Sequence, residues 1–230
     1  MSNQMETAAA AEFDQWATNG RAESMADGHR DATEQILDRW QLTDADRVLD
    51  VGCGNGWAVR WMLERGAGEG SGVDISPEMI ARAQQQTAAD MPASFAVSPG
   101  ERLPFDEQHF SAILSVESLY YYPDPAAALV EWARVSRPGG RLGIMVDLFA
   151  ENPAGPVWKD ALDVEVHLLS EADFKAMATA AGWRDVQTFR VIDRRPVKTE
   201  AEFTPSKWYP TYAIYVGYRA AGSLGITARR

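Results

Sequence analysis

The chain has 230 residues, of which 46% are hydrophobic, so it is long enough for one α/β domain with a substantial buried core. Its formal net charge of −11 excludes a general electrostatic attraction to phosphate backbones, and long nucleic acid is therefore not expected as a substrate. The single cysteine, Cys53, excludes an internal disulfide and a zinc site made of thiols, and we expect no metal ion.

Nothing in the sequence suggests insertion into a membrane or export. No stretch of about 18 consecutive apolar residues occurs, and the chain does not begin with a basic region followed by an apolar core. We therefore expect a cytoplasmic protein without a membrane span, present as a monomer or a homodimer.

The N-terminal part of the chain is predicted to be helical. Between Phe13 and Trp40 the apolar residues indicate helices, with breaks near Gly20 and near Gly28. This helical part, residues 1–46, precedes the first predicted strand.

A short apolar strand and a glycine-rich turn follow, and they are the most informative part of the chain. The strand surrounds Asp50, and the turn has a glycine at every second position, namely Gly52, Gly54 and Gly56. Because glycine lacks a Cβ, the backbone of such a turn can lie against a ligand, and the next helix points its N-terminal amides at it. The turn predicts a nucleotide-like ligand, although a plain strand-to-helix turn is the alternative. Trp57 stands where a dinucleotide fingerprint needs its third glycine.

The second predicted strand, residues 72–76, contains an acid near its end. A carboxylate at the position of Asp74 can accept two hydrogen bonds from a diol such as the ribose hydroxyls, and Ile75 would pack on an adenine. The alternative is that Asp74 caps the helix beginning at Pro77, although Ser76 suits that purpose better.

The fourth predicted strand, Phe110–Val116, ends in an acid and three tyrosines. Its nearly continuous apolar residues indicate a strand covered on both faces. Glu117 and Tyr120 follow at its carboxyl end, where ligands bind in open α/β sheets. We expect both beside the reacting atoms, and packing at the rim or in the core is the alternative for the tyrosines.

The remaining elements are predicted from apolar periodicity and turn residues. Ser170 and Asp173 have the spacing of a capping box. The segment from 147 to 170 is irregular and predicted to be a lid over a substrate. The expected strands and helices are a third strand at 93–97, a helix at 126–136, a fifth strand at 141–146, a helix from 170 to Gly182, and strands at 185–192 and 211–218.

Several of these segments together resemble the class I S-adenosylmethionine-dependent methyltransferases, in particular the group with the type 11 domain. The resemblance is carried by Asp-x-Gly-x-Gly-x-Gly at 50–56, the acid Asp74, Leu-Pro-Phe at 103–105, and Glu-x-x-Arg-Val at 131–135 followed by Pro-Gly-Gly at 138–140. It implies a Rossmann-like, seven-stranded, mostly parallel sheet with helices on both faces and an antiparallel last strand. It also implies an N-terminal cap over the cofactor cleft, residues 1–46, and a methyltransferase domain, residues 47–230.

The resemblance implies S-adenosylmethionine as the cofactor. Asp50 would bind its ammonium group, Arg21 could meet its carboxylate, and Asp74 would bind the ribose. Pro99 replaces the acid that usually receives the adenine amino group, so that Ser98, the Gly100 amide or Glu101 would have to substitute. The residues expected around the cofactor are Asp50, Gly52, Cys53, Gly54, Gly56, Asp74, Ile75, Gly100, Glu101, Glu117 and Arg21.

The implied activity is transfer of a methyl group by direct in-line displacement. Eight tryptophans and seven tyrosines favour a small apolar or aromatic acceptor over a macromolecule. A general base is needed only if the acceptor arrives protonated, and the candidates are His167, Glu117, Tyr120 and His29, with His167 preferred because it lies in the irregular segment. A surface role is the alternative for Arg21 and for His29.

Three other functions remain open at this point. The chain could bind S-adenosylmethionine without catalysis, which would explain Pro99 and the lack of a clear base. It could, less plausibly, be a nicotinamide-dependent oxidoreductase, against which Trp57 counts. Methylation of RNA or protein is a weaker option still.

Overall fold

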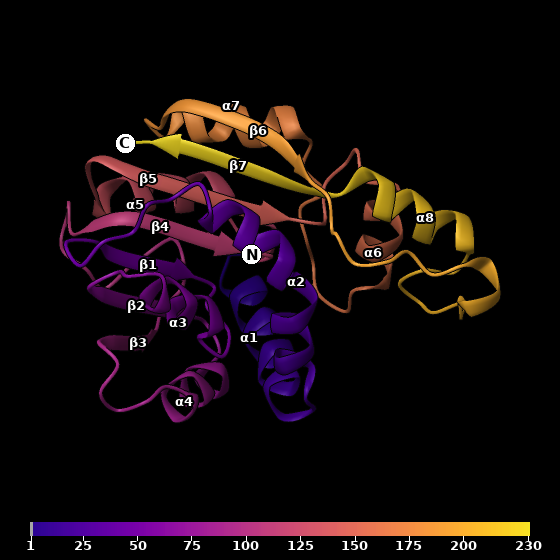
Figure 1. Cartoon of the computed structure of the whole chain (residues 1–230), viewed down its shortest axis with the longest axis horizontal. Coiled ribbons are helices and arrows are strands. Elements are labelled where there is room, and N and C mark those ends of the chain that lie inside the picture. Colours follow the sequence, from indigo (N-terminus) through magenta and orange to yellow (C-terminus); the bar gives the residue numbers. More distant parts are fainter. Residues whose placement is uncertain (1) are drawn as a thin grey trace.

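A seven-stranded sheet with helices on both faces organises the computed structural model, which describes residues 2–230 (Figure 1). The strand order is β3-β2-β1-β4-β5-β7-β6, and only β7 runs antiparallel to its neighbours. The strands are β1 Arg47–Val51, β2 Glu69–Asp74, β3 Ala93–Val97, β4 Phe110–Val116, β5 Ser136–Val146, β6 Arg184–Val191 and β7 Ser223–Arg229. The predicted fold is confirmed.

Helices connect most successive strands, as expected for a doubly wound sheet, although β3 leads to β4 without one. They are α1 Ser2–Thr18, α2 Arg21–Leu37, α3 Trp57–Glu64, α4 Pro77–Gln86, α5 Pro125–Val135, α6 Gly155–Ala161, α7 Glu171–Ala180 and α8 Tyr212–Ala221, with short 3-10 turns η1 Leu119–Tyr121 and η2 Glu200–Glu202. No helix within residues 2–230 combines the length and the hydropathy needed to cross a membrane.

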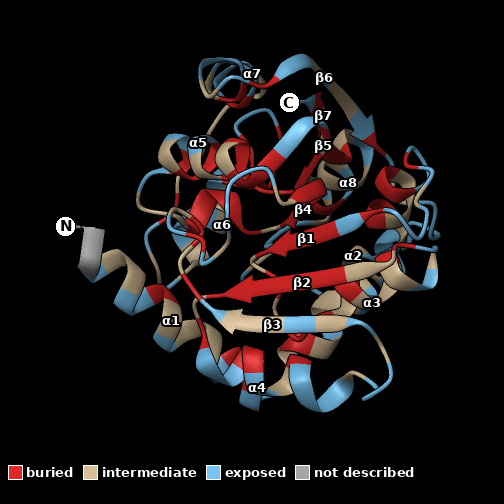
Figure 2. Cartoon of the chain, turned by 90° about the vertical axis from the view of Figure 1, so that its left-hand side faces the viewer, coloured by how far each residue is buried: buried red, intermediate tan, exposed pale blue. Residues whose placement is uncertain are grey.

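Two hydrophobic cores lie on the two faces of the sheet. On β4, Ile113 packs in the core beneath α5 and α7, whereas its neighbours Ala112 and Leu114 pack in the core beneath α2 and α3. Because successive side chains of a strand point to opposite faces, a strand covered on both sides must be apolar throughout. β1 and β2 are buried in the same way, whereas β3 at the sheet edge is intermediate or exposed (Figure 2).

Short polar side chains begin the helices that follow the strands. The Ser76 hydroxyl accepts a hydrogen bond from the Met79 amide and so caps α4. Ser170 and Asp173 form the predicted capping box at the start of α7, in which each side chain accepts from the backbone of the other.

Two sequence predictions are wrong. Gly28 does not break a helix, because α2 continues through it from Arg21 to Leu37 at the modest cost of an interior glycine. The segment predicted as a strand at 211–218 is helix α8, which the Thr211 hydroxyl caps by accepting from the Ile214 amide. The last strand is instead β7, placed between β5 and β6.

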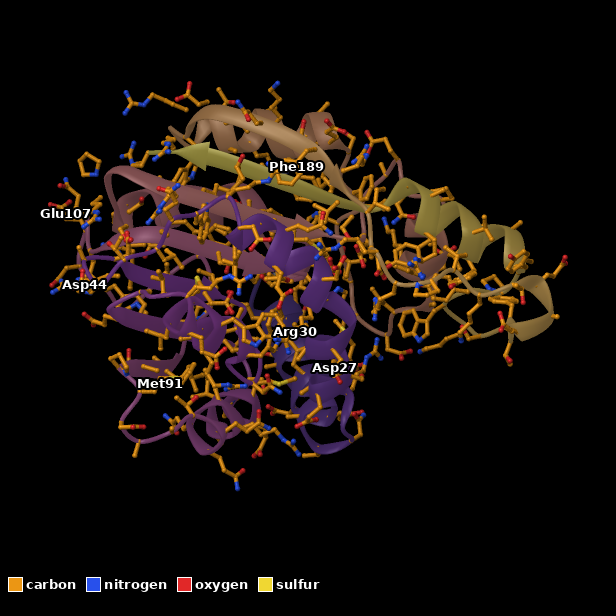
Figure 3. All side chains as sticks on the ribbon, in the orientation of Figure 1. Asp27, Arg30, Asp44, Met91, Glu107 and Phe189 are labelled. Atoms are coloured by element: carbon orange, nitrogen blue, oxygen red, sulfur yellow. The ribbon has the colours of Figure 1, made fainter. Side chains whose placement is uncertain are left out.

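The N-terminal helices cover the sheet near the glycine turn. α2 packs on α3, where the Arg30 guanidinium lies 4.7 Å from the centroid of the Trp61 ring (Figure 3). The segments 147–170 and 192–222, with α6 and α8, extend beyond the carboxyl ends of β4 and β5 (Figure 1). The carboxyl edge of the sheet is thus enclosed from two sides.

Candidate active site

A pocket opens at the carboxyl ends of β1, β2 and β4, and we call it the glycine-turn pocket. It holds about 900 Å³ of empty space, with the solvent at its mouth included. Phe13 and Trp16 of α1 and Met25 of α2 cover it. The predicted cofactor residues that line it are Gly52, Gly54, Asp74, Ile75, Gly100, Glu101 and Glu117.

The glycine turn presents bare backbone to this pocket. Gly54 has φ +50°, and a Cβ built on it would meet only the Met79 sulfur, at 4.0 Å. Gly52 has φ +79°, and a Cβ there would overlap the Ser118 side chain. Both positions therefore require glycine. Gly54 leaves space in the pocket, and Gly52 lets the turn pack against the end of β4.

Asp74 lies at the floor of the pocket and is 8% exposed. Its Oδ2 accepts a hydrogen bond of 2.8 Å from the Gly54 amide and its Oδ1 one of 2.9 Å from the Ser76 amide. Burial raises the pKa of its carboxyl to about 6, against the opposing effect of these amides. The cap of α4 is Ser76 and not Asp74. Because each oxygen of the Asp74 carboxylate accepts one amide hydrogen bond, each retains a lone pair for a diol in the pocket.

Three of the predicted cofactor residues do not line the pocket and lie behind the residues that do, namely Asp50, Cys53 and Gly56. Asp50 is 2% exposed, its Oδ1 has no hydrogen-bond partner, and burial together with the nearby Asp74 raises its pKa to about 8. Burial also raises the pKa of the Cys53 thiol, so that Cys53 stays a neutral packing residue. Gly56 begins α3 and packs against Phe95.

The segment around Pro99 forms another side of the same pocket. Ser98, Pro99, Gly100 and Glu101 all line it. The Ser98 hydroxyl already donates to the Arg102 carbonyl, at 2.6 Å. Burial raises the pKa of the Glu101 carboxyl group, which lines the pocket close to Pro99.

A second pocket, which we call the lid pocket, lies under α6, α8 and the segment 192–210. Its aromatic lining consists of Trp16, Tyr120, Tyr121, Trp158, Trp208, Tyr209, Tyr215 and Tyr218. Arg21 also lines it, and the Arg21 guanidinium lies 3.7 Å from the Trp16 ring centroid and 4.8 Å from that of Trp208. The lid pocket thus combines aromatic side chains, on which a flat molecule could stack, with charged ones, among them Asp193, Arg195, Lys198 and Arg219.

The two pockets share a wall. His29 and Glu117 line both of them, whereas Arg21 and Tyr120 line only the lid pocket. His167, the preferred base of the sequence analysis, lines neither, and its backbone amide donates to the Tyr120 carbonyl. The wall therefore brings together two of the four candidates.

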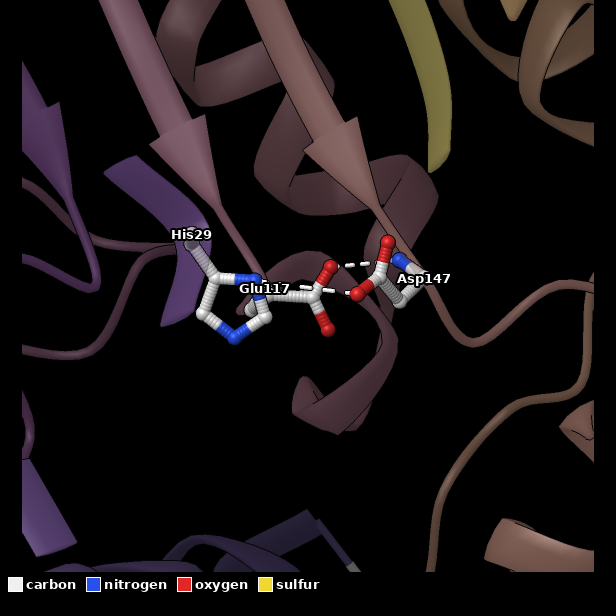
Figure 4. Close-up of side chains that lie close together, drawn as sticks. All are labelled: His29, Glu117 and Asp147. Carbon is white, nitrogen blue, oxygen red and sulfur yellow. Dashed lines mark hydrogen bonds and ion pairs between the residues drawn. The ribbon is translucent and has the colours of Figure 1, made fainter. Parts of the chain in front are cut away.

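A third side chain at this wall, Asp147, was missed by the sequence analysis. It follows β5 directly, so its position at the carboxyl end of a strand was the available signal. The His29 Nδ1 lies 3.7 Å from the Asp147 Oδ2, and the Glu117 carboxylate accepts a hydrogen bond from the Asp147 amide (Figure 4). Tyr218, also missed, donates to the Asp147 Oδ2 at 2.9 Å.

Burial shifts the pKa of Glu117 and that of His29 in opposite directions. It raises the pKa of Glu117 well above its usual range, and the charge of Asp147 adds to the effect. It lowers the pKa of His29, against the opposing charge of Asp147, so that His29 is a neutral imidazole near pH 7. Glu117 also has φ +54°, a left-handed conformation that is uncommon outside glycine and often found at functional sites.

Comparison with known proteins gives consistent matches. The family model described as a methyltransferase domain matches residues 49–144. The O-methyltransferase cnsE of Penicillium expansum is 30% identical over 200 residues, which cover 84% of this chain and 68% of the relative. The 2-methyl-6-phytyl-1,4-hydroquinone methyltransferase of Synechocystis is 38% identical over 101 residues, which cover 44% of this chain and 32% of the relative.

A solved structure with 31% sequence identity is similar over nearly the whole chain. It is a putative methyltransferase in complex with the Haloferax volcanii Trm112 methyltransferase activator, with a TM-score of 0.87, covering 95% of this chain and 97% of that one. In contrast, this chain spans only 48% of the length of two further relatives, the methyltransferase GfsG of Streptomyces halstedii and the 27-O-demethylrifamycin SV methyltransferase of Amycolatopsis mediterranei.

Proposed function

The chain belongs to the class I S-adenosylmethionine-dependent methyltransferases, and on this premise we propose that it methylates a small, apolar or aromatic molecule by direct in-line displacement. The observation that supports the proposal is the wall shared by the two pockets, which His29 and Glu117 line from both sides. A methyl donor in the glycine-turn pocket and an acceptor in the lid pocket would meet there.

The glycine-turn pocket fits the cofactor of this family. The Gly54 backbone leaves space for a ligand, and the Asp74 carboxylate faces that space with lone pairs that suit ribose hydroxyls. The Asp50 Oδ1 has no hydrogen-bond partner among the described residues and lies behind the lining of the pocket, so it could accept a hydrogen bond from an ammonium group through water. When bound, S-adenosylmethionine supplies a methyl group on a positive sulfonium, which is a good leaving group.

The residues of this chain then have to hold the acceptor and exclude water. The aromatic side chains of the lid pocket can stack on a planar acceptor and keep its nucleophilic atom in line with the methyl. The apolar residues Phe13, Trp16 and Met25 cover the donor side. A phenol or hydroquinone is the acceptor class we favour, because relatives are named as O-methyltransferases and as a hydroquinone methyltransferase.

The first test is calorimetric titration with S-adenosylmethionine and with S-adenosylhomocysteine, followed by transfer of a labelled methyl group to a panel of phenols and hydroquinones. We expect both nucleosides to bind and at least one acceptor to be methylated. Binding without transfer to any acceptor would favour a non-catalytic binding protein. Tight binding of reduced nicotinamide, followed by fluorescence, would favour the oxidoreductase instead.

A protein partner is a second part of the proposal. The similar Haloferax volcanii complex contains a Trm112 methyltransferase activator, which supports an activator of this kind for this chain as well. Co-expression with such an activator, followed by light scattering and the labelled transfer assay, tests it. A complex with increased transfer is expected, and a chain that stays a monomer or homodimer with unchanged activity would argue against the activator.

A further inference from the structure

Three metal-ligating side chains converge at the wall between the pockets. His29 comes from α2, Glu117 follows β4, and Asp147 follows β5 (Figure 4). One potential ligand atom from each lies within 4.8 Å of the other two. Atoms bound to one divalent cation lie roughly 2.0 to 2.6 Å from it and hence up to about 5 Å from one another. The spacing of the three atoms is therefore that of ligands to a single ion.

The two carboxyl groups at this wall have no close cationic partner among the described residues, although Arg21, Arg195, Lys198 and Arg219 line the same lid pocket. Asp147 is 2% exposed, and within the described part of the chain neither Asp147 nor Glu117 forms an ion pair with a lysine or an arginine. The His29 Nδ1 lies 3.7 Å from the Asp147 Oδ2. Two adjacent carboxylates in such an enclosed place are costly unless a cation accompanies them.

One oxygen atom at this wall has no hydrogen-bond partner among the residues that the structure describes. The Asp147 Oδ1 is buried and accepts no hydrogen bond, whereas the Asp147 Oδ2 accepts one from Tyr218. A buried carboxylate oxygen without a partner carries a desolvation cost that a bound cation would remove. This observation is independent of the spacing of the cluster and points to a missing ligand.

The surrounding hydroxyls hold both carboxylates in place. Tyr120 donates to the Glu117 Oε2 at 2.7 Å, and Tyr218 donates to the Asp147 Oδ2 at 2.9 Å. Such outer hydrogen bonds are typical of metal ligands, because they orient the ligand and leave its other lone pairs free. The left-handed backbone of Glu117, with φ +54°, aims this side chain at the cluster at the expense of local strain.

We propose that His29, Glu117 and Asp147 bind a divalent cation, such as Mg²⁺ or Mn²⁺, which holds an oxygen atom of the methyl acceptor at the wall between the two pockets. The two carboxylates suit both ions, the imidazole is a ligand more typical of a transition metal such as Mn²⁺, and three protein ligands leave coordination positions open for the acceptor. The proposal rests on the proposed methyl transfer and replaces the expectation of a metal-free site.

The transfer of the methyl group to the acceptor oxygen follows from this arrangement. Coordination lowers the pKa of the acceptor hydroxyl, so that its proton leaves to solvent water. A lone pair of the resulting oxyanion forms the new O–C bond with the methyl carbon. The S–C bond breaks at the same time, and its electron pair stays on the sulfur, which becomes neutral.

The experiment is a titration of the native protein with Mn²⁺, in which the free ion is followed by electron paramagnetic resonance. S-adenosylhomocysteine is present at saturation, and Mg²⁺ and Zn²⁺ serve as competitors. We expect binding of one Mn²⁺ that is weakened about tenfold or more in His29→Ala, Glu117→Gln and Asp147→Asn. The matched controls are His109→Gln and Glu165→Gln, which remove the same kinds of group outside both pockets and should bind Mn²⁺ as the native protein does.

The outcomes separate this proposal from the proposed function. Binding of S-adenosylhomocysteine reports whether each variant is folded, and the titration of the native protein is decisive even where a variant does not fold. Methyl transfer that EDTA leaves unchanged, in a protein that binds none of the three ions, would overturn the metal site while the function stands. His29 as a general base, or a cationic amine as the acceptor, would then explain the cluster. Mn²⁺ binding without transfer to any acceptor would support the site and overturn the function.

Discussion

The Gly54 amide donates a 2.8 Å hydrogen bond to the carboxylate of Asp74, which lies twenty residues further along the chain. This bond joins the glycine turn after β1 to the end of β2, so that these two sides of the glycine-turn pocket have one fixed geometry. A ligand that contacts the turn therefore also meets the Asp74 carboxylate.

Removal of the Asp74 carboxylate should weaken cofactor binding. Asp74→Ala leaves the ribose hydroxyls without their acceptor and frees the Gly54 amide, and we expect a loss of about 1 to 3 kcal/mol in binding free energy. Calorimetric titration with S-adenosylhomocysteine measures this loss. A dissociation constant equal to that of the native protein would contradict the ribose assignment.

Substitution of Gly54 should block the cofactor without destroying the fold. A Cβ on Gly54 would stand in the pocket, and with φ +50° the Gly54→Ala variant also carries backbone strain of about 1 kcal/mol or more. Gly139→Ala is the matched control, since Gly139 has φ +76°, no atom within 4 Å of an added Cβ, and no place in either pocket. We expect similar losses of thermal stability in both variants and loss of S-adenosylhomocysteine binding only in Gly54→Ala. Equal binding by both variants would show that the turn is merely structural.

The buried Asp50 should make stability depend on pH. Its carboxyl has a pKa of about 8 in the folded protein and its usual value of 3.8 when exposed by unfolding. The folded state thus holds this proton more tightly, and the free energy of unfolding falls as the pH rises from about 4 to about 8. Asp50→Asn removes this contribution, so the variant should gain stability relative to the native protein as the pH rises through this range. Thermal unfolding of both proteins between pH 5 and pH 9 measures the difference, and parallel curves would contradict the prediction.

Loss of the Tyr218 hydroxyl should affect the acceptor side alone. Tyr218→Phe removes the hydrogen bond to Asp147, and because Tyr218 lines only the lid pocket, cofactor binding should not change. We expect kcat/KM for the methyl acceptor to fall about tenfold, as is usual when a group that orients a site residue is removed. Tyr212→Phe is the control, since Tyr212 donates to the Lys198 carbonyl and lines neither pocket. An equal effect in both variants would contradict a specific role for Tyr218.

Much of the glycine-turn pocket could be predicted, because the features that form it lie within a few consecutive residues. The glycines at 52 and 54 require a left-handed backbone within one turn, and the acid of Asp74 comes directly at the end of its strand. It could not be predicted that Asp50 and Cys53 lie behind the lining of the pocket. Which residues of the turn face the pocket and which face the core depends on how the turn packs against β2 and β4.

The lid pocket, the proposed site of the methyl acceptor, could not be predicted because it is formed by segments that are distant in the sequence. Tyr218 was not recognised as a site residue because the segment 211–218 was predicted to be a strand. Tyrosine, isoleucine and valine favour a strand on propensity alone. The Thr211 cap and packing over the lid pocket nevertheless make this segment a helix. His167 looked suitable because it lies in an irregular segment, yet its side chain lines neither pocket.

The sequence by itself determined the five strands from β1 to β5, the glycine turn and the family, because each of these is encoded in the spacing of neighbouring residues. Only the tertiary structure decided that His29, Glu117 and Asp147 meet. They come from α2 and from the ends of β4 and β5, and no local pattern relates them. Their meeting follows from the parallel pairing of β4 with β5, which brings two carboxyl ends to one edge, and from the packing of α2 over that edge.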